Sequence, residues 1–225
     1  MKFNIFLMVI DSLQARKFYG KKTSLTPNID SLIKKGTYFE NLISTCDTSL
    51  LSLTSLFTGK HAFKTGIRSS RYNKLNNDII TYFQILKESG YNLFGYKPTV
   101  EEIVGLMPTF ENKDSDYFYD YDLSNGLGHQ ILDRLDSKLP EPWFFYTHHS
   151  DLHFPVDVPK EFDNEKFGVS KYEQMISSID SWIGKFVEKI DLEKTLFIIT
   201  ADHATFVPSV DVNDKVVSFE VDAKK

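Results

Sequence analysis

The feature that most constrains the fold is an uninterrupted apolar run near the start of the chain, residues 3–10 (FNIFLMVI), which ends at Asp11. A run without polar alternation is typical of a strand buried on both faces of a parallel sheet. Two later runs have the same character, WFFYTH at 143–148 and TLFIIT at 195–200. The chain is therefore expected to form a sheet whose strands are covered on both sides.

The segments between these runs complete an alternating pattern of strands and helices. Helices are expected at 26–35, 49–58, 76–89, 126–138 and 169–190, and further strands at 37–43 and 91–96. The acidic and aromatic stretch 111–122 (ENKDSDYFYDYD) is expected to be a surface loop. The alternation predicts an α/β fold with a mostly parallel central sheet and helices on both faces.

Size and composition limit the classes of protein to consider. A chain of 225 residues suffices for one α/β domain. Its net charge of -5, without a long basic run, argues against nucleic acid as a main partner. No apolar window is long enough to span a membrane, and no small-residue cleavage site follows residues 1–10, so a cytoplasmic chain is expected. Cys46 is the single cysteine, which excludes an intrachain disulfide and a thiolate metal cage.

Polar residues follow the three apolar runs. They are Asp11-Ser12, the cluster at 148–151, and Asp202-His203. Because the carboxyl ends of parallel strands share one sheet edge, where ligands bind, these residues are expected to converge. Asp202 and His203 can ligate one divalent ion together, although a helix-capping acid explains Asp202 as well. Taken alone, Asp11 is more typical of an N-cap; nearby Asp202 and His203 favour a metal ligand instead.

Three of the six histidines lie within six residues, at His148, His149 and His153. Imidazoles so concentrated suit a metal ion or an anionic substrate, whereas a polar loop with exposed histidines is the structural alternative.

Ser49 begins the helix expected at 49–58. A serine in this position is usually only an N-cap. The same position exposes free backbone N–H groups, which attract phosphate or sulfate, and a nearby metal would activate the hydroxyl.

Taken together, the ordered segments resemble the sulfatase family of the alkaline phosphatase superfamily. The resemblance runs from residue 3 to about residue 204. Its segments are VIDSL (9–13), TPNIDSL with GTYFEN (26–41), SLLSLTSLFTGK (49–60), ILKESGYNLFGY (85–96), HHSDLHFP (148–155) and the run from Lys171 to His203.

The resemblance implies roles for particular residues. One divalent metal ion (Ca, Mg, Mn or Zn) would be held by Asp11, Asp202 and His203. Ser49, ten residues before Gly59, would be the nucleophile.

It also implies roles around the substrate. His153 would act at the leaving group, and Lys60 would prop the nucleophile. His148 and Lys97 would bind an anionic ester substrate.

Departures from the family pattern refine these expectations. Leu51 and Leu53 stand where the family has Pro and Arg, so a plain hydroxyl at Ser49 is expected rather than formylglycine. Ser12 replaces a second acid, and Ala204 replaces a Gly. The resemblance further implies a single sulfatase-like domain over 1–225 without the usual C-terminal subdomain.

The sequence therefore predicts a metal-dependent hydrolase or transferase of sulfate or phosphate esters. A plain hydroxyl favours phosphoryl transfer. The main alternative is an inactive sulfatase-like binding or scaffold module, and a third hypothesis is a transferase of a phosphate-containing head group.

Overall fold

A parallel five-stranded sheet forms the centre of the protein, whose computed structural model describes residues 2–20, 22–68, 74–99, 104–117, 122–204, 209–212 and 215–218. The strand order is β3-β2-β4-β1-β5, and every neighbouring pair is parallel. The strands are β1 (Asn4–Ile10), β2 (Asn92–Pro98), β3 (Asp116–Tyr117), β4 (Trp143–His149) and β5 (Thr195–Ala201). A separate antiparallel pair follows, β6 (Ser209–Val212) and β7 (Lys215–Ser218). The predicted α/β class with a parallel sheet is confirmed.

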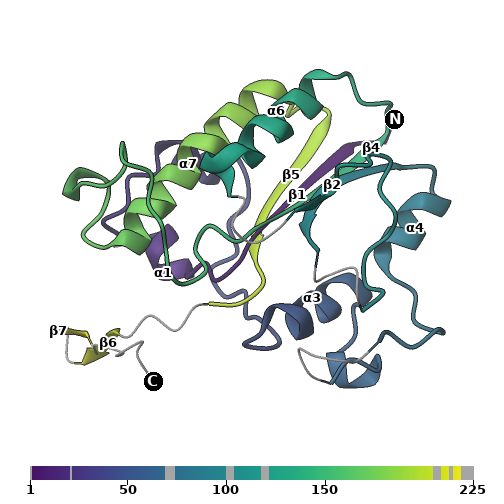
Figure 1. The fold of residues 1–225 in the computed structure, drawn as a ribbon, viewed down its shortest axis with the longest axis horizontal. Helices are drawn as coiled ribbons and strands as arrows, with labels where there is room; N and C mark the ends of the chain where they lie inside the picture. Colours follow the sequence, from purple (N-terminus) through teal and green to yellow (C-terminus); the bar gives the residue numbers. More distant parts are fainter. Residues whose placement is uncertain are drawn as a thin grey trace.

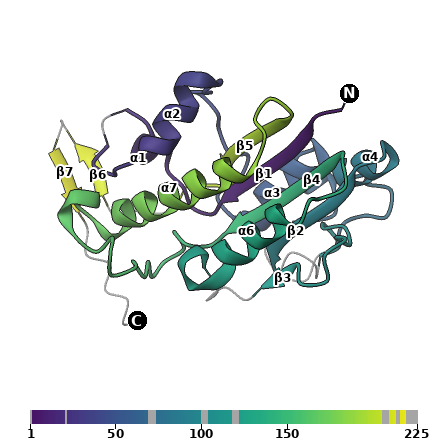
Figure 2. The same ribbon diagram turned by 90° about the horizontal axis from the view of Figure 1, so that it is seen from above.

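Helices cover both faces of this sheet (Figure 1 and Figure 2). One layer contains α2 (Pro27–Lys35), α6 (Gly128–Asp136) and the long α7 (Lys171–Lys189). The other layer contains α3 (Ser49–Thr58) and α4 (Tyr82–Glu88). Short elements lie in the connections: α1 (Ala15–Phe18), η1 (Ala62–Lys64), η2 (Leu123–Leu127) and η3 (Glu165–Phe167).

Alternate residues of each strand belong to two separate cores. Phe6, Met8 and Ile10 of β1 pack in the cluster under α7, whereas Leu7 and Val9 pack in the cluster under α3 and α4. Since each buried side chain of this size contributes about 1.5–3 kcal/mol, both faces of β1 stabilise the fold. This two-sided burial explains why the strand sequences lack polar alternation.

Local signals set the helix boundaries. Pro27 occupies the first turn of α2, and Gly59 ends α3 in the left-handed conformation at φ 65°. Ser170 caps α7 by accepting a hydrogen bond from the backbone N–H of Glu173. Thr81 and Gln84 form a capping box that begins α4 at Tyr82.

Three sequence predictions need correction. Residues 37–43 form no strand. Phe39 and Ile43 in this segment are 71% and 84% exposed, so these apolar side chains are not buried in the sheet. The helix expected from residue 76 begins only at Tyr82, after a turn in which Ile79 N–H bonds to the carbonyl of Asn76.

The stretch 111–122 contains β3 instead of being loop throughout, because residues 116–117 pair with the end of β2. Residues 118–121 of that stretch lie outside the described residues.

Among the helices of the described segments, none has the length and apolar character needed to cross a membrane.

Candidate active site

Three adjacent strands bring acidic and imidazole side chains to the carboxyl edge of the sheet. Pairing places Val9 opposite both His148 and Thr200. Asp11 and Asp202 each lie two residues beyond a member of this row, so they project from the same face, the one covered by α3. The polar strand ends therefore meet at the edge where parallel sheets bind ligands.

The carboxylates of Asp11 and Asp202 are buried close to the imidazole of His148. Asp11 and Asp202 are each 1% exposed. One ligand atom from each of them and one from His148 all lie within 4.8 Å of one another. Oδ2 of Asp202 has no hydrogen-bond donor, and no lysine or arginine of the described residues pairs with either acid. This set of donors fits a divalent metal ion.

His203 faces the same pair of acids. Its Nε2 lies 3.8 Å from Oδ1 of Asp11 and 3.4 Å from Oδ2 of Asp202. Its other ring nitrogen, Nδ1, lies 3.0 Å from the carbonyl oxygen of Ala204. All three metal ligands predicted from the sequence therefore lie together, and His148 offers a second imidazole.

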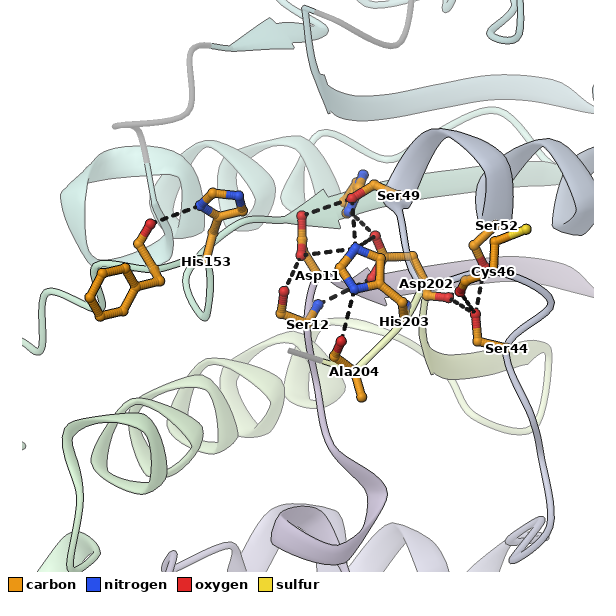
Figure 3. Close-up of polar contacts among 12 residues, drawn as sticks. Asp11, Ser12, Ser44, Cys46, Ser49, Ser52, His153, Asp202, His203 and Ala204 are labelled. Carbon is orange, nitrogen blue, oxygen red and sulfur yellow. Dashed lines mark hydrogen bonds and ion pairs between the residues drawn. The ribbon is translucent and has the colours of Figure 1, made fainter. Parts of the chain in front are cut away.

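Ser12 ties the two acids to each other (Figure 3). Its hydroxyl donates to Oδ1 of Asp11 at 2.6 Å, and its backbone N–H donates to Oδ1 of Asp202 at 3.1 Å. Ser12 adopts φ 66°, a conformation that non-glycine residues seldom take and that turns its N–H toward Asp202. Tyr172 of α7 holds this turn, donating its hydroxyl to the Ser12 carbonyl at 2.7 Å and accepting from Gln14 N–H at 2.8 Å.

Ser49 lies at the first turn of α3, directed at the acids (Figure 3). Its Oγ lies 3.0 Å from Nε2 of His203 and 3.3 Å from Oδ2 of Asp11. The first N–H groups of α3 have no acceptor within the helix, and the preceding Thr48 makes no side-chain cap that would satisfy them. These groups and the helix dipole favour an anion beside Ser49.

Two further serines fix the loop that carries Asp202. Ser44 donates to the carbonyl oxygen of Asp202 at 2.6 Å, and Ser52 of α3 donates to the same oxygen. These hydrogen bonds fix the end of β5 relative to the start of α3.

The histidine cluster divides between two sides of the sheet. His149 is fully buried, and its Nε2 lies 2.9 Å from Oγ1 of Thr147. Burial, with a smaller contribution from His148, lowers the pKa of His149 to about 3, so this imidazole is neutral. His153 is exposed and lies apart from the acids, with Nδ1 3.1 Å from the carbonyl oxygen of Phe154 (Figure 3).

The two predicted lysines lie away from Ser49. Lys60 follows the opposite end of α3, about 15 Å along the helix axis, so the structure does not bring it to the nucleophile. Lys97 is buried on β2 and forms an ion pair with Asp116 of β3. The pairing of β2 with β4 carries Lys97 level with His148, but β2 lies two strands away from β1, which leads to Asp11.

Sequence reasoning missed several residues of this site. It treated Ser12 as a lost ligand, whereas the structure gives Ser12 two contacts with the acids. It assigned His148 to the substrate, whereas His148 belongs to the group of potential metal ligands. The position of Ser12 directly after Asp11 was the available signal. Nothing in the sequence pointed to Ser44 or Tyr172.

Comparisons with solved structures show the same fold in ester hydrolases. A putative sulfatase from Bacteroides thetaiotaomicron has 18% identity and a TM-score of 0.71, over 91% of this chain and 59% of that chain. A 2-O GAG sulfatase has 17% identity and a TM-score of 0.72, over 98% and 61%. The phosphonate monoester hydrolase of Agrobacterium radiobacter has 16% identity and a TM-score of 0.72, over 90% and 63%. The chain thus spans about three fifths of the length of these structures.

No curated protein matches the chain by sequence. The sequence model of the sulfatase family does match, over residues 3–211. That match covers nearly the whole chain and agrees with the fold. The chain belongs to the sulfatase family.

Proposed function

We propose that the chain is a metal-dependent hydrolase of sulfate or phosphate esters, with Ser49 as the nucleophile. The observation that carries the proposal is the position of Ser49 Oγ, 3.3 Å from Asp11 Oδ2 and 3.0 Å from His203 Nε2. A hydroxyl beside a buried acid and an imidazole is the arrangement expected of an activated nucleophile.

Asp11 and Asp202 would hold a divalent metal ion, with His148 and His203 as the imidazole ligands. When bound, such an ion polarises the ester oxygens and favours the ionised form of a neighbouring hydroxyl. The protein's own part is to fix the donors. Ser12 orients both carboxylates, and Ser44 and Ser52 hold the backbone of Asp202.

The reaction would begin with attack of Ser49 Oγ on the phosphorus or sulfur of the ester. The hydroxyl proton has an acceptor within hydrogen-bond range, since Asp11 Oδ2 faces Oγ. The free N–H groups at the start of α3 would stabilise the anionic oxygens of the transferred group.

As the ester bond breaks, the alcohol oxygen leaves and takes a proton. His153 keeps the predicted role of general acid in this step. Water then releases the phosphate or sulfate from Ser49. Lys97, which pairs with Asp116, keeps only the predicted role of a substrate-binding residue.

The decisive experiment compares Ser49→Ala with Ser55→Ala, which removes another hydroxyl from α3. Turnover of an aryl phosphate and an aryl sulfate is measured with added Ca, Mg, Mn or Zn. Loss of the nucleophile should lower kcat by at least about a thousandfold, whereas Ser55→Ala should retain activity. Circular dichroism checks that both variants fold. Undiminished turnover in Ser49→Ala would refute the role of Ser49 as the nucleophile.

The same screen tests the alternative of an inactive binding module. That alternative requires no turnover of either ester and no thermal stabilisation by any of the four ions. The buried pair Asp11 and Asp202 argues against it, because two acids buried side by side cost stability, and a scaffold without a metal gains nothing from them.

A further inference from the structure

A cleft with acidic walls opens at the loop that follows β4. Three carboxylates line it: Asp122, Asp151 and Asp157. Phe154 and Met175 also line it, and no lysine or arginine is among the described residues that do so. His153 belongs to the same lining. The cleft therefore combines negative charge with apolar surface.

Asp151 supplies the observation that points to a ligand. The residue is only 5% exposed. Its Oδ1 accepts the backbone N–H of Leu123 at 3.1 Å, but its Oδ2 has no hydrogen-bond partner. Burial, and then the charge of Asp122, raises the pKa of Asp151 to about 7. A positive charge held in the cleft would stabilise the ionised form of this buried carboxylate.

The spacing of the acids selects the kind of cation. Within the described segments, Asp11, His148 and Asp202 are the only acids or histidines that place three ligand atoms within 4.8 Å of one another. The acids of the cleft therefore do not form a cluster of three such ligand atoms, which favours a larger cation over a bare ion. An organic ammonium group is larger and donates N–H bonds, and it also interacts favourably with an aromatic ring such as that of Phe154, which is 71% exposed.

We propose that this cleft binds an organic ammonium group, carried on the alcohol portion of the ester. The second half of this statement rests on the proposed function. Ser150 and Asp151 follow His148 within three residues, and His153 lines the cleft. A substrate with its anionic group beside Ser49 could thus extend its alcohol portion past His153 toward Asp151.

The test uses a small cation that contains no ester. Ethanolammonium and its neutral isostere propan-1-ol are titrated at pH 8, where Asp151 is ionised. Binding is followed in 1H–15N NMR spectra at the amide of Leu123, which is hydrogen bonded to Asp151. The cation should bind at least about tenfold more tightly than the alcohol.

Three variants give the controls. Asp151→Asn keeps an acceptor for the Leu123 amide but should abolish the preference for the cation. Asp136→Asn changes an exposed acid that pairs with Lys189, and should keep the preference. Ser49→Ala should also keep it, so a failed nucleophile and a failed cleft are distinguishable.

Two results would overturn the proposal. One is equal binding of ethanolammonium and propan-1-ol by the unmodified protein. The other is perturbation of the Leu123 amide by Mg2+ alone, which would identify the cleft as a metal site.

Discussion

Ser12 and Asp202 are joined by a hydrogen bond of 3.1 Å between the backbone N–H of Ser12 and Oδ1 of Asp202. The two residues lie 190 positions apart in the chain. This contact links the turn after β1 to the turn after β5. The Ser12 hydroxyl also donates a hydrogen bond to Asp11. Ser12, at a position where the resemblance implied a second acid, thus contacts both Asp11 and Asp202.

The Ser12 hydroxyl should therefore contribute to metal affinity without being a ligand. Ser12→Ala removes its bond to Asp11 and leaves the backbone bond to Asp202 in place. Because such supporting contacts typically change metal affinity 10–100-fold, we expect a loss of about tenfold or more, measured by calorimetric titration of metal into chelator-treated protein. Ser24→Ala, which removes a hydroxyl bonded to the carbonyl of Lys17, is the control. Equal affinities in the two variants would contradict the orienting role.

The buried acids should destabilise the metal-free protein. Asp202→Asn removes one of two facing negative charges but keeps an oxygen for the Ser12 amide. We expect the variant to melt at a higher temperature than the unmodified protein in chelator, and to gain no stability when metal is added. Thermal denaturation with and without metal measures both effects. A variant still stabilised by metal would show that Asp202 is not a ligand.

Asp151 should make stability depend on pH. Its pKa is raised from 3.8 to about 7 in the folded state, so between these values the folded protein binds more protons than the unfolded chain. Stability is therefore lost as pH rises from about 4 to about 7. Since one pKa unit corresponds to about 1.4 kcal/mol, the loss is at most about 4 kcal/mol.

Urea denaturation across this pH range checks the effect. Asp151→Asn cannot ionise, so subtracting its curve isolates the contribution of Asp151 from those of other groups. Parallel curves for the two proteins would show that Asp151 has an ordinary pKa.

Asp180 of α7 should be a strong anchor for α2. Its carboxylate accepts the backbone N–H groups of Asn28 and Ile29 and the side-chain amide of Asn28. Asp180→Ala leaves these donors unpaired at the start of the helix, which should cost about 2–4 kcal/mol of stability. Asp163→Ala breaks an exposed pair with Lys171 and should change stability by less than about 1 kcal/mol. Chemical denaturation measures both, and similar losses would contradict the capping role.

The sequence alone determined the class of fold and much of the candidate site. Uninterrupted apolar runs form the strands of a parallel sheet that is buried on both faces. An acid directly after such a run lies at the carboxyl edge of that sheet. For that reason Asp11, Asp202 and His203 could be expected at one sheet edge without coordinates, and the resemblance to the sulfatase family implied that they hold a metal. The start of α3 at Ser49 also followed from local signals, since a serine before an apolar helical segment ending in Gly59 defines its own boundaries.

Only the tertiary structure decided which further side chains join them. Strand register and alternation direct His148 toward the acids and His149 away from them, although the two are adjacent in sequence. The same geometry turns Ser12 into a bridge and leaves Lys60 at the far end of α3. Residues 37–43 have the composition of a strand but find no partner in the sheet. Such outcomes depend on contacts between residues that are distant in the chain, so they cannot be predicted from any one segment of the sequence.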